Sequence, residues 1–220
     1  MNLVYCFLQS SNAPYSNFWT ELLINHDYWW QNWEVFNQRF LAFRLSLFSY
    51  LDKSNVSLAQ LFHGAIFSEQ FDATTIVVPT ISDIKLTTIN FRYPTTKREQ
   101  SFSTAEFVLN GDGAAFDAFS YLQTQSSKTL FALQMKFSKL ETKNPLKIDD
   151  KLIHTEYEKV RDSIKNSLPG IDFVFVLIAH CHAVLNRENL PPNCIIISIA
   201  EESLFYGQSY YQRLNRLGFH

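Results

Sequence analysis

The stretch "FDAFSYLQTQSSKTLFALQMKFSK", residues 116–139, contains two apolar segments separated by a polar tip. Apolar runs joined by a short polar connection predict an antiparallel β-hairpin. Because successive side chains of a strand point to opposite faces, Asp117 lies on one face of the first strand, while Gln134 and Lys136 share a face of the second. Pairing of the strands can bring these three polar side chains to the same side of a sheet.

A carboxylate inside an apolar strand is costly unless a positive charge compensates it. For Asp117 one compensator is a salt bridge with Lys136, and the other is a divalent cation, which carboxylate, amide and carbonyl oxygens can bind. Hydrolysis of a phosphodiester needs such a cation, together with a lysine that orients the attacking water. The hairpin therefore predicts either a buried ion pair or a site for Mg²⁺ or Mn²⁺ whose ligands are Asp117, Gln134 and the main-chain carbonyl of Met135.

The segments around the hairpin predict an α/β fold with a mixed central β-sheet flanked by helices. Ser57 and Gln60 form the pattern of a capping box, which predicts a helix over residues 57–71. An amphipathic pattern predicts a second helix over residues 153–168, and a helical segment is expected near the C-terminus. The expected strands cover residues 74–79, 85–94, 103–110, 172–180 and 194–200.

Residues 1–56 differ in composition from the rest, because Trp19, Trp29, Trp30 and Trp33 fall in one short stretch. We therefore expect an aromatic-rich helical extension over residues 1–56 and a second domain over residues 57–220. Aromatic residues at helical spacing are typical of a core or an interface, so this extension is expected to cover the sheet or to meet a partner, and a homodimer is one alternative. A stacking platform for bases is the less favoured alternative.

Composition excludes some classes of protein. The chain has 220 residues, 46% hydrophobic content and a formal net charge of −2, so it can bury a full core and any contact with nucleic acid must come from a local patch. Its three cysteines, an odd number without metal-binding spacing, are expected to be free thiols in a reducing, intracellular compartment. No apolar run is long enough to cross a bilayer, so no membrane partner is expected.

Asp117, followed by Gln134, Met135 and Lys136, resembles the site of the PD-(D/E)XK, or restriction endonuclease-like, nuclease superfamily. The glutamine is similar to the branch that contains restriction enzymes for methylated DNA. From about residue 57 to 217, the segments "FDAF", "LFALQMKFSK", "HTEYEKVRDSI", "DFVFVLIAH" and "LFYGQSYYQRL" resemble the nuclease-like domains of crinkler effectors and retrotransposon hot-spot proteins. The resemblance implies a restriction endonuclease-like core and a nuclease that uses Mg²⁺ or Mn²⁺, with DNA as the expected substrate.

The family also places a glutamate on its first helix, in a context that here reads Leu61, Phe62, His63. The resemblance therefore puts His63 in the acid's position, as a neutral ligand or a group that orients water, and Glu69 is the alternative source of a carboxylate. This departure leaves a second function open, in which a degenerate nuclease fold serves as a binding module for nucleic acid or a host protein.

Three basic residues are candidates for contacts with substrate phosphates. Lys159 is expected on the polar side of the helix after the hairpin, and Lys97 and Arg98 lie in the loop "TTKREQS", residues 95–101. Tyr157 on the same helix is expected in the core. The resemblance to crinkler effectors also implies action inside a host cell. If the protein is a secreted effector, its expected destination is the host nucleus.

Overall fold

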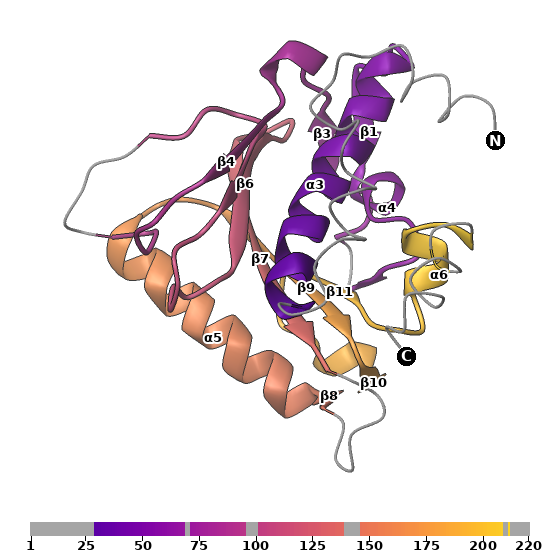
Figure 1. The fold of residues 1–220 in the computed structure, drawn as a ribbon, viewed down its shortest axis with the longest axis vertical. Helices are drawn as coiled ribbons and strands as arrows, with labels where there is room; N and C mark the ends of the chain where they lie inside the picture. Colours follow the sequence, from indigo (N-terminus) through magenta and orange to yellow (C-terminus); the bar gives the residue numbers. More distant parts are fainter. Residues whose placement is uncertain (1–28, 69–70, 96–100, 139–145, 209–210, 212–220) are drawn as a thin grey trace.

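The computed structural model describes residues 29–68, 71–95, 101–138, 146–208 and 211. A seven-stranded mixed sheet, in the order β2-β11-β9-β7-β6-β5-β4, forms the centre of the fold (Figure 1). Three neighbouring strands, β11, β9 and β7, are parallel, and β6 pairs antiparallel with β7. The strands of this sheet are β2 (Ile66–Phe67), β4 (Lys85–Thr88), β5 (Glu106–Leu109), β6 (Ala118–Gln123), β7 (Lys128–Phe137), β9 (Phe173–His180) and β11 (Cys194–Ile197).

Helices cover both faces of the sheet. The helix α3 (Trp29–Tyr50) crosses one face, and α5 (Asp150–Ser167) lies on the other (Figure 1). Asp149 caps the start of α5 by accepting a hydrogen bond from the Leu152 amide. Shorter elements complete the described chain: the antiparallel pair β1 (Asn55–Ser57) and β3 (Thr75–Val77), the parallel pair β8 (Lys147–Asp149) and β10 (His182–Val184), α4 (Leu58–Leu61), α6 (Glu202–Phe205), and the 3₁₀ turns η1 (Ile81–Asp83) and η2 (Arg187–Asn189).

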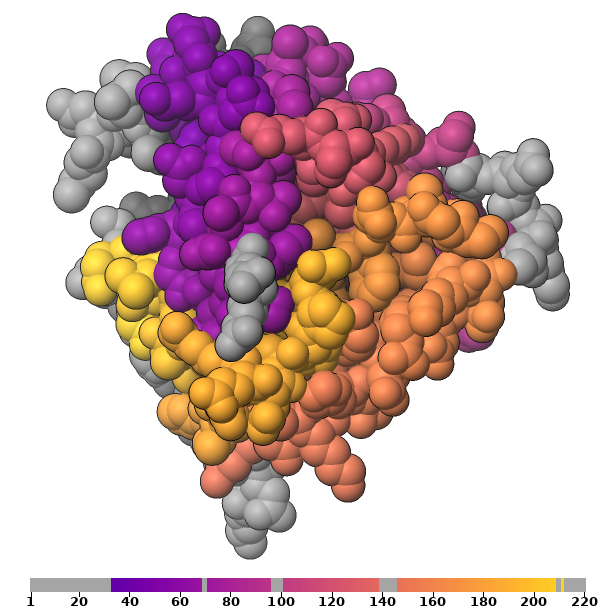
Figure 2. Space-filling view, turned by 180° about the vertical axis from the view of Figure 1, so that it is seen from behind, coloured from indigo at the N-terminus to yellow at the C-terminus, as the bar shows by residue number. Residues whose placement is uncertain are grey.

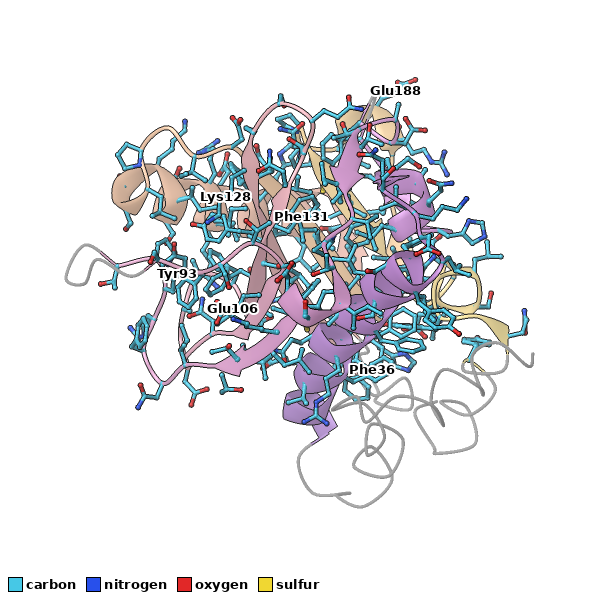
Figure 3. The ribbon with its side chains drawn as sticks, turned by 90° about the horizontal axis from the view of Figure 1, so that it is seen from above. Phe36, Tyr93, Glu106, Lys128, Phe131 and Glu188 are labelled. Carbon is cyan, nitrogen blue, oxygen red and sulfur yellow. The ribbon has the colours of Figure 1, made fainter. Side chains whose placement is uncertain are left out.

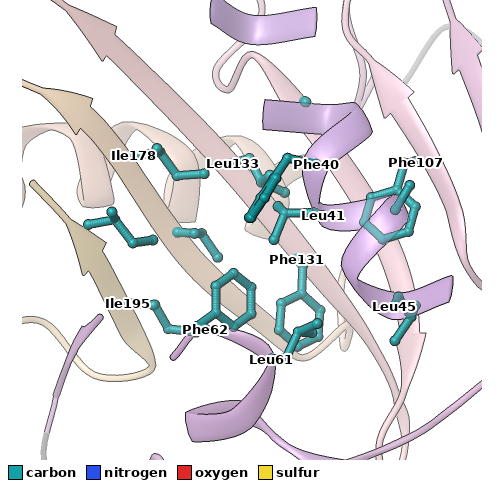
Figure 4. Close-up of a cluster of buried hydrophobic side chains, with 14 of the residues drawn as sticks. Phe40, Leu41, Leu45, Leu61, Phe62, Phe107, Phe131, Leu133, Ile178 and Ile195 are labelled. Atoms are coloured by element: carbon teal, nitrogen blue, oxygen red, sulfur yellow. The ribbon is translucent and has the colours of Figure 1, made fainter. Parts of the chain in front are cut away.

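The side chains of β7 alternate between two hydrophobic clusters. Phe131 and Leu133 point to the α3 face, where Figure 4 shows them with residues of α3, α4 and β9. Leu130 and Ala132 point to the α5 face and pack in a second cluster. Phe131 and Phe36 of α3, both labelled in Figure 3, belong to the first cluster. Asp117 precedes Ala118, which belongs to the α3 face, so alternation assigns Asp117 to the α5 face with Gln134 and Lys136.

Hydrogen bonds fix α3 on the sheet and against the C-terminal segment. The buried amide Nε2 of Gln38 donates to the carbonyl oxygens of Thr87 and Phe107, at 2.9 and 2.7 Å. The Arg44 guanidinium donates to the Phe205 carbonyl at 2.7 Å and lies 5.1 Å from the centroid of the Phe205 ring. On the face shown in Figure 2, the yellow C-terminal segment lies beside a purple segment from the N-terminal part of the described chain. These contacts hold the middle and the C-terminal half of α3 at a defined position.

The mixed α/β architecture and the antiparallel hairpin are confirmed. The helix expected over residues 57–71 is wrong beyond its first turn: the capping box of Ser57 and Gln60 is present, but α4 ends at Leu61. Gly64 then adopts a φ of +90°, and a Cβ there would lie 2.4 Å from the Leu204 Cβ. This left-handed backbone turns the chain into β2, which a helix would not allow.

The expected boundary at residue 56 stays a prediction, although α3 shares one hydrophobic cluster with the sheet. Among the described residues, no helix combines the length and apolar character needed to cross a membrane.

Replacement of Phe131 tests the central packing. Its side chain is 1% exposed and stacks on Phe62 at a centroid distance of 6.3 Å. We expect Phe131→Ala to lower the free energy of unfolding by about 3–5 kcal/mol, because it removes buried surface and leaves a cavity. Urea unfolding followed by circular dichroism measures this. The control Val184→Ala, at a side chain that is 73% exposed, should change it by less than about 0.5 kcal/mol.

Candidate functional site

Strands β6 and β7 separate at one end of the hairpin. The pairing of β6 begins at Ala118, opposite Leu133, whereas β7 continues to Phe137 alongside β9. Asp117 is the residue directly before β6. We call the region formed by Asp117 and residues 134–137 the strand fork.

The carboxylate of Asp117 fills the gap at the strand fork. Its Oδ2 accepts a hydrogen bond from the Met135 amide at 2.6 Å and another from Gln134 Nε2 at 2.7 Å. The Asp117 amide in turn donates to the Leu133 carbonyl at 2.9 Å. Asp117 and Gln134 therefore meet on one side of the sheet, as alternation along the strands predicts.

Lys136 forms its ion pair with a residue of the helix opposite. Its Nζ lies 2.7 Å from Oε1 of Glu156 on α5, and the side chains of Lys136 and Glu156 are 26% and 13% exposed. The Asp117–Lys136 salt bridge, one alternative predicted for the hairpin, is not among the ion pairs of the described residues. Lys136 pairs with Glu156 instead. Lys136 stays close enough for its charge to lower the pKa of Asp117.

Asp117 lacks full compensation for its burial. Burial raises its pKa from the ordinary value of 3.8 to about 6, although the Met135 amide and the Lys136 and Lys159 charges act in the opposite direction. The Glu156 charge raises the pKa further. A half-buried carboxyl group whose charge is poorly compensated is a candidate functional group.

A second carboxyl group, Glu34 of α3, interacts electrostatically with this region from the other face of the sheet. Burial raises its pKa from 4.5 to about 8, and the charges of Asp117 and Asp112 contribute, while Lys136 lowers it. Glu34 is thus within electrostatic reach of both charged residues of the hairpin, Asp117 and Lys136. It was missed in the sequence because its helix was interpreted as an aromatic cover; the available signal is that Glu34 is the one acid in the sequence of α3.

Two positions proposed for the helix acid lie elsewhere. His63 is exposed in the turn after α4, and its neighbour Phe62 stacks on Phe131, four residues or about 13 Å along the strand from Met135. Glu69 lies outside the described residues. The structure therefore brings Glu34, rather than His63, toward the strand fork.

The other predicted residues are less closely involved. Lys159 has a side chain that is 51% exposed, with Nζ 3.8 Å from Glu156 Oε2. Tyr157 is buried against Phe173 and Phe175, which confirms its place in the core. Lys97 and Arg98 lie outside the described residues.

The histidines of "HCH", residues 180–182, have separate surroundings. His180 is buried at the end of β9, where its Nδ1 lies 2.8 Å from Oε1 of the buried Glu202, and His182 is exposed at the start of β10. Cys181 and Cys194 are buried free thiols, as predicted, and Cys6 lies outside the described residues.

Four groups at or near the strand fork carry oxygens that a cation could bind. Two are the carboxylates of Asp117 and Glu34. The third is Oε1 of Gln134, a buried atom without a hydrogen-bond partner. The fourth is the Met135 carbonyl, which points to the same side of the strand as the amide that meets Asp117. Over the described ranges, no group of three or more His, Cys, Asp and Glu side chains could hold a metal, so a site here would combine two carboxylates with amide and carbonyl oxygens.

Comparison of the chain with models of protein families, with curated proteins and with solved structures finds no match in any of the three.

The raised pKa values predict a stability that falls as the pH rises. Between pH 4 and 6 for Asp117, and between pH 4.5 and 8 for Glu34, the folded state holds a proton that the unfolded state has released. Folding is therefore favoured at the lower pH, with a slope of up to about 1.4 kcal/mol per pH unit for each group. Since both side chains are partly exposed, we expect a smaller total loss, about 1–3 kcal/mol, in urea unfolding measured without metal.

Isosteric variants separate this effect from other titrating groups. Asp117→Asn should remove the part of the loss between pH 4 and 6, and Glu34→Gln the part that extends to pH 8. Profiles of both variants that run parallel to the wild-type profile would contradict the assignment.

Proposed function

We propose that the chain is a metal-dependent nuclease that hydrolyses phosphodiester bonds, built on a restriction endonuclease-like core. The observation that carries this proposal is the arrangement at the strand fork: Asp117 and Gln134 meet on one face of the sheet, and the Lys136 ammonium lies close by in an ion pair with Glu156. An acid at the end of one strand and Gln-x-Lys on the next match the pattern on which the family resemblance rests.

The oxygens at the strand fork fit a Mg²⁺ or Mn²⁺ ion. Gln134 directs Nε2 at Asp117 and leaves Oε1 unpaired, and a half turn about its terminal bond would exchange the two atoms. That exchange would place an amide oxygen beside the carboxylate, as a hard cation requires. Asp117, Glu34, Gln134 and the Met135 carbonyl would then hold the ion. A bound cation would also stabilise the charged forms of Asp117 and Glu34, the two carboxyl groups whose pKa values are raised here.

A divalent cation supplies positive charge to a phosphate oxygen and makes a bound water more acidic. The residues of the chain perform the other tasks. Lys136, partly exposed and held by Glu156, presents N–H donors that can orient a water or meet a phosphate oxygen. Asp117, together with Glu34 once it has released its proton, gives the fork the negative charge that attracts the cation. Gln134 is buried beside Asp117, so its side-chain amide has a defined position next to the carboxylate.

The choice of DNA rests on the family resemblance. Lys159, with an exposed ammonium one turn of α5 from the Lys136 pair, supports a contact with the phosphate backbone near the fork. A crinkler-like effector that acts inside a host cell, including its nucleus, is the biological setting that this resemblance supports. The alternative is a degenerate nuclease fold that binds nucleic acid or a host protein without cleaving it.

Cleavage of plasmid DNA tests the nuclease. We expect nicking that requires added Mg²⁺ or Mn²⁺, and a loss of at least about 100-fold in rate for Asp117→Asn and Lys136→Met, because each removes a group that acts at the phosphate. Glu34→Gln should weaken the binding of Mn²⁺ measured by calorimetry. As a control, Lys85→Met changes an exposed lysine on the edge strand β4 and should leave the rate unchanged.

The outcomes separate the two functions. Wild-type protein that binds no Mn²⁺ and cleaves neither DNA nor RNA would refute the nuclease. Metal-independent binding of nucleic acid that survives Asp117→Asn would then support the binding module instead.

A further inference from the structure

We propose that Glu156 of α5 is a positioning residue, which holds the Lys136 ammonium away from Asp117 and so leaves the Asp117 carboxylate for a divalent cation. This inference rests on the proposed function, because it concerns the same site. Neither the hairpin pattern nor the family resemblance assigns a role to Glu156.

Glu156 occupies an unusual position for an acid. The buried residues of α5 include Ile153, Tyr157 and Val160, and residue 156 lies three positions after the first and four before the last. Residues at these spacings share a face of a helix, so Glu156 faces the sheet. Its side chain is only 13% exposed, and within the described ranges its Oε2 has no hydrogen-bond partner, although the Lys159 ammonium lies 3.8 Å away. The desolvation of a buried ion pair can cost more than the attraction between its charges returns. Stability alone therefore does not explain the acid at position 156.

The geometry defines what that purpose is. Asp117, Gln134 and Lys136 lie on the α5 face, so Lys136 has carboxylates on both sides: Asp117 at the strand fork and Glu156 on the helix. The 2.7 Å ion pair shows that the ammonium is directed to the helix. The Asp117 carboxylate meets only uncharged donors, the Met135 and Gln134 N–H groups. Without Glu156, the flexible lysine would turn to Asp117 and compete with a cation for the same oxygens.

A double-mutant cycle on Mn²⁺ binding tests this competition. We expect Glu156→Gln to weaken Mn²⁺ binding about tenfold, measured by calorimetry at pH 7.5. In the Lys136→Met background, which has no ammonium to turn, the same substitution should change the affinity less than twofold. The double variant has no buried charge left unpaired, so it provides a folded reference. Glu158→Gln is the matched control, because Glu158 lies on the exposed side of α5 with Arg161 at 3.9 Å.

Each result decides the proposal. A Glu156→Gln variant that binds Mn²⁺ as well as the wild type, or a loss of the same size in both backgrounds, would overturn it and leave Glu156 a merely structural residue. If the wild type binds no Mn²⁺, the proposed function fails, and a crystal structure of metal-free Glu156→Gln then decides the role of Glu156. The Lys136 Nζ should lie within hydrogen-bond distance of Asp117 in that structure; an ammonium still directed at α5 would refute the positioning role.

Discussion

The hydrogen bond from the Met135 amide to the Asp117 carboxylate is the contact on which the site depends. A strand that loses its neighbour leaves amide groups without partners, and a buried amide must find another acceptor. At the strand fork the acceptor is a side chain, so the start of β6 and the C-terminal part of β7 are joined by a carboxylate instead of a peptide group. The same bond aims one oxygen of Asp117 into the fork and fixes Gln134 beside it.

The charges around this bond are distributed unevenly. Glu34 from α3 and Asp117 from the hairpin interact electrostatically, while the lysine that could neutralise them is paired with Glu156 on α5. The two helices therefore have different effects: α3 brings a second carboxyl group within electrostatic reach of the fork, and α5 draws positive charge away from it. The packing of α3, through Gln38 and Arg44, determines where Glu34 lies.

The hairpin and the side on which Asp117 and Gln134 meet could be predicted from the sequence, because strand alternation is strictly local. Glu34 could not, because no local pattern indicates which residue of an aromatic helix will come within reach of a strand fork more than 80 residues away in the sequence. The helix expected after Ser57 failed for a related reason: the pattern was correct over one turn, and the left-handed Gly64 packed against Leu204 then ended it. Contacts between distant segments decided both cases.

The role of Asp117 in joining the strands does not explain why it is an acid. An asparagine offers an oxygen to the Met135 amide as well as a carboxylate does, and it carries no charge to bury. Aspartate is the costlier choice here, since burial raises its pKa to about 6 and the Lys136 ammonium is directed elsewhere. A side chain that only joined two strands would gain a stronger hydrogen bond from this charge, but the raised pKa shows that burial outweighs that gain. A divalent cation at the fork would use the charge, and this difference between the needs of the fold and the residue present is the strongest physical argument for a metal-dependent function.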